Sequence, residues 1–305
     1  MKIHYVDWNP TAASKQTVET ANAIIEEYEA DGYTLTLRQL YYQFVQRGYI
    51  ENTTRSYKNL GSLITKAREA GLLSWTAIED NERVLKEWHI QENERMIIAG
   101  LETDLVLDKW AQQDTYVEVW VEKAALAEVV GRAASQFQVP YLACKGFLSA
   151  SAAWRAGQRF EYAQAQGKDC VVLHLGDHDP SGLDMTRDNQ DRLDIFAGEH
   201  AVEVRRLALN MSQVEQYTPP PNPAKMTDSR AAGYVQRYGG SSWELDALEP
   251  AVISDLITDD LREIIDEDVW EETKRAQVEA RKTLVALSYN WDEISRYIEE
   301  NFADD

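Results

Sequence analysis

The sequence predicts an α/β protein in which a mostly helical N-terminal domain precedes a domain built on a parallel β-sheet. Two observations lead to this fold class. Three short amphipathic helices and a short β-element fill the first quarter of the chain. From Thr115 onward, apolar strands alternate with helices, and that alternation is typical of a parallel sheet covered by helices. We expect the domains to span residues 1–105 and 106–305.

The N-terminal elements follow from apolar spacing and capping residues. A helix over 17–30 places five apolar side chains on one stripe: Val18, Ala21, Ile24, Ile25 and Tyr28. Thr36 with Gln39 forms a capping-box pattern, which predicts a second helix over 37–46. The third helix is expected at about 57–70, and residues 72–78 as a short strand or wing. Three helices and a β-element in this order indicate a winged helix-turn-helix.

The second domain is predicted from its apolar runs. A polar helical stretch over 81–100 leads into it. Residues 218–223, which are rich in proline, are expected as a stiff loop and not a strand, and residues 250–302 as helices. The βα units, each a strand followed by its helix, are 115–121 with 124–136, 139–143 with 149–166, and 170–175 with 181–195, and a last strand covers 202–209.

Composition bounds the class of protein. The chain has 305 residues, a net charge of −21 and no apolar run approaching the ~20 residues that a membrane helix needs. It shows no secretion signal, and its two cysteines, Cys144 and Cys170, fall in predicted strands, so we expect a cytoplasmic location. The charge argues against a general nucleic-acid coat, but residues 38–68 hold six basic residues against one acidic residue.

Acidic residues follow two of the predicted strands. Glu122 comes directly after 115–121, and Asp177 and Asp179 follow 170–175. The carboxyl ends of parallel strands converge on one crevice, and several carboxylates there suit Mg²⁺. The alternative for an Asp-x-Asp pair is a helix N-cap, made by Asp179 or Ser181. Acids on two neighbouring strands favour the metal site, because caps do not require them.

His174 and His178 allow a second metal hypothesis, a transition-metal site of the His-x-x-x-His type. His174 lies within the predicted strand, and strand alternation points it away from its neighbours. A packed core histidine is therefore the preferred interpretation.

Tyr42 is the candidate nucleophile. The inward stripe of the second helix comprises Leu37, Leu40, Tyr41, Phe44 and Val45. Tyr42 is rotated by about 100° from Tyr41, so we expect it to be exposed on the face that carries Arg38. A cation beside a phenol stabilises the phenolate and can bind a phosphate. The alternative interpretation is an ordinary Tyr–Arg pair on the surface.

Basic side chains give candidate DNA contacts. They lie on the third helix and beside the acids, where solvated surface residues are the alternative interpretation. The candidates are Arg55, Lys58, Lys66, Arg68, Lys123 and Lys145.

These motifs, taken in order, resemble the A subunit of type IIB DNA topoisomerases (topoisomerase VI) and its meiotic double-strand-break relatives. The resemblance covers about 210 residues and depends on short strings that match the winged helix and the Toprim fold of that family. They are Leu37-Arg38-Gln39-Leu40-Tyr41-Tyr42, Val121-Glu122-Lys123, Lys145-Gly146, Asp177-His178-Asp179-Pro180-Ser181-Gly182 and Trp243-Glu244-Leu245-Asp246-Ala247-Leu248.

The resemblance implies a DNA-cleaving transesterase. Tyr42 would attack a phosphodiester of double-stranded DNA to give a 5′-phosphotyrosyl link, and Arg38 would help to bind the phosphate. Glu122, Asp177 and Asp179 would hold Mg²⁺, with Mn²⁺ as a substitute. It further implies a homodimer, in which the tyrosine and the acids of one active site come from different protomers. Any ATP-driven strand passage would need a separate ATPase subunit, since the sequence has no recognisable nucleotide-binding motif.

Two competing functions stay open. One is a hydrolytic Toprim nuclease, similar to the nuclease subunits of SMC-like plasmid-defence complexes, in which Tyr42 is not used. The other is a non-catalytic DNA-binding or assembly protein, which would not need acids at all three metal positions.

Overall fold

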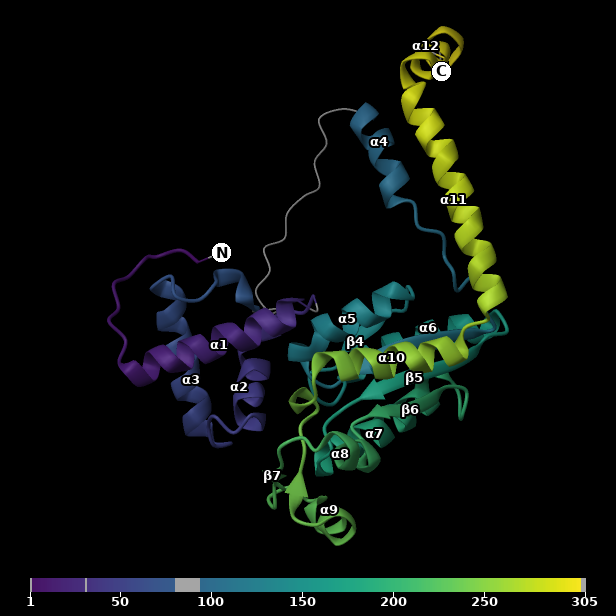
Figure 1. Cartoon of the computed structure of the whole chain (residues 1–305). Coiled ribbons are helices and arrows are strands. Elements are labelled where there is room, and N and C mark those ends of the chain that lie inside the picture. The colour runs from purple at the N-terminus through teal and green to yellow at the C-terminus, as the bar shows by residue number, and fades with distance from the viewer. Residues whose placement is uncertain (1, 31, 80–93, 303–305) are drawn as a thin grey trace. The chain divides into compact units, whose positions relative to one another are not determined.

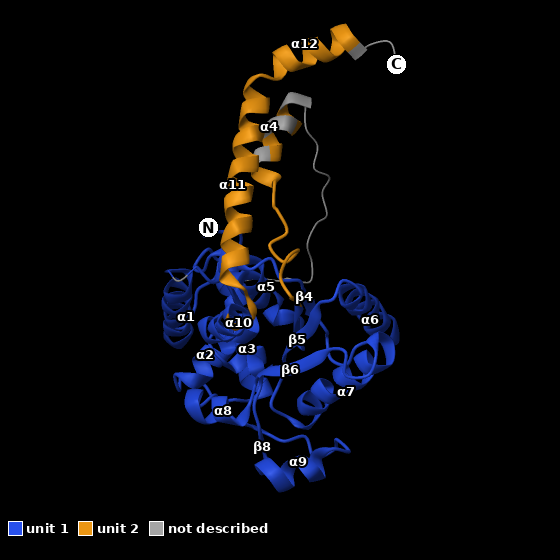
Figure 2. Ribbon diagram, turned by 90° about the vertical axis from the view of Figure 1, so that its right-hand side faces the viewer, with its two compact units in different colours: residues 1–83, 116–262 blue, residues 84–115, 263–305 orange. Residues whose placement is uncertain are grey.

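The computed structural model describes residues 2–30, 32–79 and 94–302 (Figure 1). Contacts divide the chain into two compact units, residues 1–83 with 116–262 and residues 84–115 with 263–305 (Figure 2). The predicted boundary between residues 105 and 106 stays a prediction, because this division does not test which segment folds by itself. Most of the helix predicted over 81–100, namely residues 81–93, lies outside the described residues.

The N-terminal part of the first unit contains the three predicted helices. They are α1 (Ala12–Ala30), α2 (Leu37–Gln46) and α3 (Thr54–Glu69). The capping box is confirmed, since the Gln39 backbone N–H donates to Thr36 Oγ1 and the Thr36 N–H donates to Gln39 Oε1. Two short strands, β1 (Leu35–Thr36) and β2 (Ile78–Glu79), pair in parallel, and a 3₁₀ turn (Trp75–Ala77) precedes β2. All five stripe residues predicted for α1 are buried.

A four-stranded parallel sheet forms the rest of that unit's core, which confirms the α/β class. Its strands lie in the order β4-β3-β5-β6. The chain therefore moves from β3 to β4 on one side and then crosses to β5 on the other, which makes a topological switch point between β3 and β5. The strands are β3 (Thr115–Val121), β4 (Tyr141–Ala143), β5 (Asp169–Leu175) and β6 (Glu203–Ala208).

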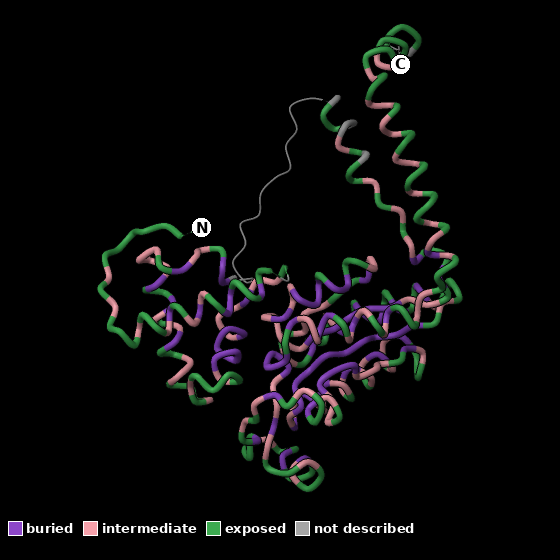
Figure 3. Tube along the Cα trace, viewed as in Figure 1, coloured by how far each residue is buried: buried purple, intermediate pink, exposed green. Residues whose placement is uncertain are grey.

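Three helices connect these strands. They are α5 (Ala127–Gln136, after a 3₁₀ turn over Ala124–Leu126), α6 (Ala150–Ala165) and α7 (Pro180–Ala197). Trp120, Val172 and Phe160 are buried in one apolar cluster, in which side chains of β3 and β5 meet α6. Figure 3 shows buried residues concentrated along the strands of the sheet. The continuous apolar character of these strands explains why they were predictable, because strands covered on both faces carry few polar residues.

The segment after the sheet carries short elements before its last helix. The prediction of no strand over 218–223 is wrong at its end, since Asn222 and Pro223 pair with Ser242 and Ser241. Proline is tolerated there because a two-residue ladder requires few backbone donors. The elements are α8 (Met211–Tyr217), β7 (Asn222–Pro223), α9 (Ala231–Tyr238), β8 (Ser241–Ser242), a 3₁₀ turn (Leu245–Ala247) and α10 (Pro250–Ile264).

The second unit is helical and is made from two distant segments. Its helices are α4 (Glu94–Asp104), α11 (Glu267–Tyr289) and α12 (Trp291–Phe302), and α4 runs beside α11 (Figure 2). Gln113 exchanges two hydrogen bonds with the backbone of Asp266, at 3.0 and 2.8 Å. Within the described ranges, no helix has the length and apolar character needed to cross a membrane.

Candidate active site

Glu122 and Asp177 lie together at the switch point, where β3 and β5 end. The backbone N–H of Glu122 donates to the Leu175 carbonyl at 2.8 Å, which aligns the two strand ends. The Asp177 N–H then donates to Glu122 Oε2 at 2.9 Å. The convergence expected for these two acids is therefore present in the structure.

The surroundings of both carboxyl groups favour their protonated forms. Burial raises the pKa of Asp177 to about 7, against the opposing charge of Lys123, whose Nζ lies 3.0 Å from Asp177 Oδ1. Burial also raises the pKa of Glu122, and the charge of Asp179 adds to that increase. Burial thus disfavours the ionised form of both carboxyl groups more than the neighbouring cations favour it.

Asp179 caps the helix that follows. Its Oδ1 accepts a hydrogen bond from the Gly182 N–H at 2.6 Å, at the start of α7. The N-cap interpretation describes this carboxylate in the structure, and its role as a metal ligand stays a prediction. Gly182 is required at the turn, because a Cβ there would overlap the carbonyl oxygen of Asp177.

Arg206 supports the acidic loop from β6. One guanidinium nitrogen donates to the carbonyls of Gly176 and Asp177, at 3.0 and 2.6 Å, and the other donates to Gly182 O and Thr186 Oγ1. Burial lowers the pKa of Arg206 to about 10, so it remains a cation at neutral pH. Sequence reasoning did not single out this residue, because nothing local marks β6 as the neighbour of the loop.

A charge network links the acids to the N-terminal helices. Lys123 lies 2.7 Å from both Glu244 and Asp246, and Arg38 pairs with the same two acids. The Asp246 side chain is fully buried, and both cations lie within ion-pair distance of it. Sequence reasoning noted this segment only as part of the resemblance and assigned no role to Glu244 or Asp246.

His178 connects the segment that carries Glu244 and Asp246 to the site. Its backbone exchanges two hydrogen bonds with Trp243, at 2.8 and 3.0 Å, and its ring Nδ1 lies 2.9 Å from the Tyr234 hydroxyl. The bridge fixes the residues after Trp243 against the Asp177 loop, where the Leu245 N–H donates to Asp177 Oδ1 at 2.8 Å. His174, by contrast, is fully buried, and its Nδ1 lies 2.9 Å from Thr186 Oγ1, which confirms the core histidine interpretation.

Tyr42 is buried, with 3% of its surface exposed, so the prediction of an exposed tyrosine is wrong. Residues around Ala247 pack on the side of α2 that the helical pattern alone leaves open. The expected proximity to Arg38 is confirmed, with the guanidinium carbon 5.8 Å from the ring centroid. Burial, together with Asp246 and Glu244, raises the pKa of the Tyr42 phenol, and the charge of Arg38 opposes this.

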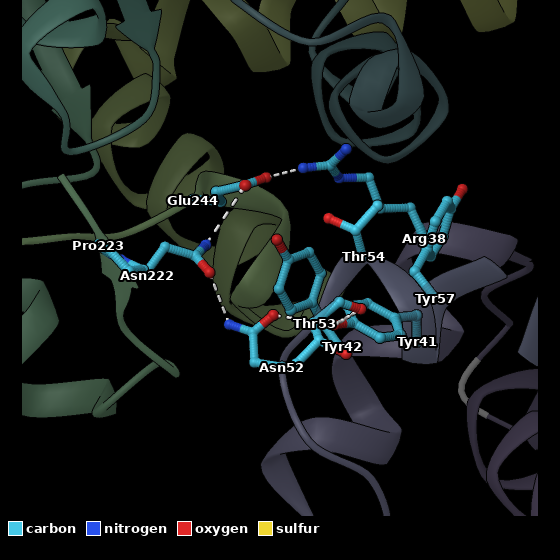
Figure 4. Close-up of a pocket in the computed structure, with 10 residues that line it drawn as sticks. All are labelled: Arg38, Tyr41, Tyr42, Asn52, Thr53, Thr54, Tyr57, Asn222, Pro223 and Glu244. Atoms are coloured by element: carbon cyan, nitrogen blue, oxygen red, sulfur yellow. Dashed lines mark hydrogen bonds and ion pairs between the residues drawn. The ribbon is translucent and has the colours of Figure 1, made fainter. Parts of the chain in front are cut away.

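A polar pocket of about 390 Å³ opens beside Tyr42 (Figure 4). Hydrogen bonds join its walls, from Asn52 to Asn222 at 2.7 Å and from Asn222 to Glu244 at 3.3 Å. Tyr41 donates to Asn52 at 2.9 Å, so its hydroxyl is engaged in the structure. The lining residues are Arg38, Tyr41, Tyr42, Asn52, Thr53, Thr54, Tyr57, Asn222, Pro223 and Glu244.

The candidate DNA contacts separate into two groups. Arg55, Lys58, Lys66 and Lys145 are exposed. Arg68 is half-buried, donates to the Trp75 carbonyl at 2.6 Å and stacks on its ring, and Lys123 is engaged in the charge network. Contact between any of these residues and DNA stays a prediction.

The acids present are compatible with a magnesium ion. Among the described residues, no three His, Cys, Asp or Glu side chains are arranged to hold a metal. Mg²⁺ in proteins keeps several waters and requires only one or two carboxylates. Glu122 and Asp177 supply such a pair, and a divalent cation would favour the ionised form of each carboxyl group, which burial disfavours.

No protein-family model matches the sequence, and no curated protein matches it either. The resemblance to the topoisomerase VI A subunit therefore rests on the sequence motifs themselves.

Proposed function

We propose that the chain is a Mg²⁺-dependent DNA-cleaving transesterase of the topoisomerase VI A type, with a winged helix followed by a Toprim domain. One observation carries the proposal. Tyr42, Arg38 and Glu244 line a single pocket, and Lys123 links Glu244 to Asp177 at the strand ends. A tyrosine, a guanidinium and the candidate metal ligands thus belong to one connected site.

The chemistry assigned to the chain is a transfer of a phosphodiester to tyrosine. The Tyr42 oxygen forms a bond to phosphorus while the bond from phosphorus to the 3′ oxygen breaks. The phenolic proton leaves to water or base, and the 3′ oxygen takes up a proton, giving a 5′-phosphotyrosyl link and a 3′-hydroxyl. Because the pKa of Tyr42 is raised, the attack depends on positive charge beside the phenol and the phosphate, which Arg38 supplies.

Glu122 and Asp177 would hold the metal, with Asp179 as a third candidate. Bound Mg²⁺ or Mn²⁺ would supply positive charge to the phosphate oxygens. The proposal includes a cytoplasmic homodimer that cuts both strands of DNA, assisted by a separate ATPase subunit. The contacts that connect Tyr42 to the acids lie within one chain, so assembly of each site from two protomers requires its own test.

The burial of Tyr42 favours a second candidate, a hydrolytic Toprim nuclease. With 3% of its surface exposed, the tyrosine must be uncovered before it can reach a DNA strand. Water needs no such movement, and the same acids and metal would serve hydrolysis. The two candidates differ in whether a covalent protein–DNA product forms.

Covalent trapping on supercoiled plasmid tests both candidates. The protein is incubated with Mg²⁺ or Mn²⁺ and quenched with detergent, and the wild type is compared with Tyr42→Phe, Tyr41→Phe and Asp177→Asn. Tyr41→Phe is the matched control, because Tyr41 is also buried and lines the same pocket. Covalent 5′ adducts that disappear only in Tyr42→Phe and Asp177→Asn support the transesterase.

The other outcomes are equally definite. Cut DNA with free ends, unchanged in Tyr42→Phe and lost in Asp177→Asn, supports the nuclease. Intact DNA with a folded wild-type protein under both metals contradicts cleavage by this chain alone, and leaves a binding role or a missing subunit.

A further inference from the structure

Three donors from separate elements converge on the carboxylate of Glu244. Arg38, from α2, pairs with Oε2, and Lys123, just after β3, lies 2.7 Å from the same oxygen. Asn222, from β7, donates to Oε1 at 3.3 Å (Figure 4). These residues are far apart in the sequence, and the fold assembles them around one anion.

The two acids of the network differ in exposure. The Asp246 side chain is fully buried and contacts both Arg38 and Lys123, so it is their fixed counter-ion. The Glu244 side chain is 26% exposed and lines the pocket, together with Arg38. Glu244 can therefore turn into solvent, whereas Asp246 has no such path.

Glu244 is present as a carboxylate anion. Burial by itself would raise its pKa, but the charges and hydrogen bonds of Lys123 and Arg38 outweigh burial and hold the pKa at about 2. The position is thus occupied by a fully charged group that accepts hydrogen bonds from a guanidinium, an ammonium and an amide.

We propose that the Glu244 carboxylate occupies an anion subsite that takes a DNA phosphate, and that Glu244 withdraws when the phosphate binds. A phosphate presents tetrahedral oxygens that accept from all three donors at once, and arginine forks bind phosphate and carboxylate alike. That the anion belongs to DNA rests on the proposed function. The subsite itself does not depend on catalysis by Tyr42.

Competition by an internal carboxylate weakens binding of the external anion. Removing the charge of Glu244 should free the donors and tighten DNA binding about tenfold, which is ~1.4 kcal/mol. If Glu244 were only a structural partner of Arg38 and Lys123, its loss would leave binding unchanged or weaker.

The test measures binding without cleavage. A fluorescein-labelled DNA duplex is titrated with protein in EDTA, and fluorescence anisotropy gives Kd for the wild type, Glu244→Gln and Glu215→Gln. Glu215 is exposed on α8, so its variant controls for the general loss of one negative charge. We expect about tenfold tighter binding for Glu244→Gln alone. Equal Kd values for the two variants, or weaker binding by Glu244→Gln, would overturn the proposal.

Asn222→Ala gives a second, independent reading. It removes the amide donor and leaves both cations, so DNA binding should weaken several-fold. Thermal unfolding establishes that each variant folds. If Glu244→Gln does not fold, an unchanged Kd for Asn222→Ala decides against the subsite.

Titration with inorganic phosphate tests the subsite independently of the proposed cleavage reaction. Raising its concentration should raise the unfolding temperature of Glu244→Gln more than that of Glu215→Gln. Tighter phosphate binding together with no cleavage in the plasmid assay would retain the subsite and reject the transesterase. Plasmid cleavage by the wild type, combined with unchanged DNA binding and unchanged phosphate stabilisation in Glu244→Gln, would reject the subsite and retain the transesterase.

Discussion

Arg206 holds the backbone of Asp177, with a 2.6 Å hydrogen bond from its guanidinium to the Asp177 carbonyl oxygen. The Asp177 carboxylate is left for Lys123 and the Leu245 N–H. Backbone and side chain of one residue are thus fixed by different partners. An arginine that is buried among carbonyl oxygens also supplies positive charge beneath the acids.

Replacing Arg206 by Met should remove both effects. Several buried carbonyls lose their donor, so the free energy of unfolding should fall by about 3–5 kcal/mol. Mn²⁺ binding should weaken because the loop that carries Asp177 loses its support, and this effect should outweigh the removal of one repelling cation. Urea denaturation and Mn²⁺ titration measure the two effects. Arg205→Met is the control, because Arg205 lies on the same strand but is partly exposed and pairs with Glu203 and Asp260. Its cost should be about 1 kcal/mol or less; similar losses in both variants would contradict this account.

Gly182→Ala should be strongly destabilising. The added Cβ overlaps the Asp177 carbonyl oxygen, which is backbone and cannot move aside without distorting the acidic loop. We expect a loss of at least about 2 kcal/mol in the free energy of unfolding. Gly233→Ala, in α9, meets no atom within 4 Å and should be neutral or gain up to about 1 kcal/mol. Thermal unfolding of the pair checks the contrast, and a tolerated Gly182→Ala would refute the overlap.

Thr36→Ala should cost about 1 kcal/mol of stability. The substitution removes the hydroxyl half of the capping box at the start of α2, the helix that carries Arg38 and Tyr42. Thr65→Ala provides the comparison, since Thr65 is exposed within α3 and its hydroxyl donates to the Gly61 carbonyl of the same helix. Urea denaturation should show a loss below about 0.5 kcal/mol there. Equal losses would mean that the cap contributes nothing specific.

The raised pKa of Asp177 predicts a pH-dependent stability. Its pKa is about 7 in the folded chain and ~3.9 when unfolded, so ionisation is costlier in the folded state. The free energy of unfolding should therefore fall as pH rises from about 4 to 7 and level off above that. Asp177→Asn removes this contribution, and its stability relative to wild type should rise by at least ~1 kcal/mol across the window.

Unfolding temperatures measured from pH 4.5 to 8 in EDTA check this prediction. Asp255→Asn, a change at an exposed carboxyl in α10, is the control and should follow the wild-type profile. If the unfolding temperature of Asp177→Asn changed with pH in the same way as that of the wild type, the prediction would be wrong. Added Mg²⁺ should stabilise the wild type more at pH 8 than at pH 6, because protons compete with the metal for the carboxylate.

Much of the fold was predictable because its signals are local. The buried strands read as continuous apolar runs, and Thr36 with Gln39 marked the start of α2. Glu122 and Asp177 were found because a parallel sheet brings strand ends together whatever the intervening sequence.

The errors arose where distant segments meet. The helical pattern placed Tyr42 outside the stripe of Tyr41 and so predicted it to be exposed, but both tyrosines are buried in one cluster that also contains Ala247, about 200 residues later. Asp246 reads as an ordinary surface acid, since the two cations that allow its burial come from α2 and from the end of β3. No local spacing contains that information.

The pairing of α4 with α11 has a consequence for how the chain folds. The two helices are separated by more than 150 residues, and the whole of the parallel sheet lies between them in the sequence. Contacts of such long range form late, since closing a long loop costs entropy before the contacts repay it. During synthesis α4 is made before α11, so it remains without this contact until the rest of the chain has been synthesised. The sheet can fold in that interval, and docking of α11 onto α4 would then be the last step to complete the molecule.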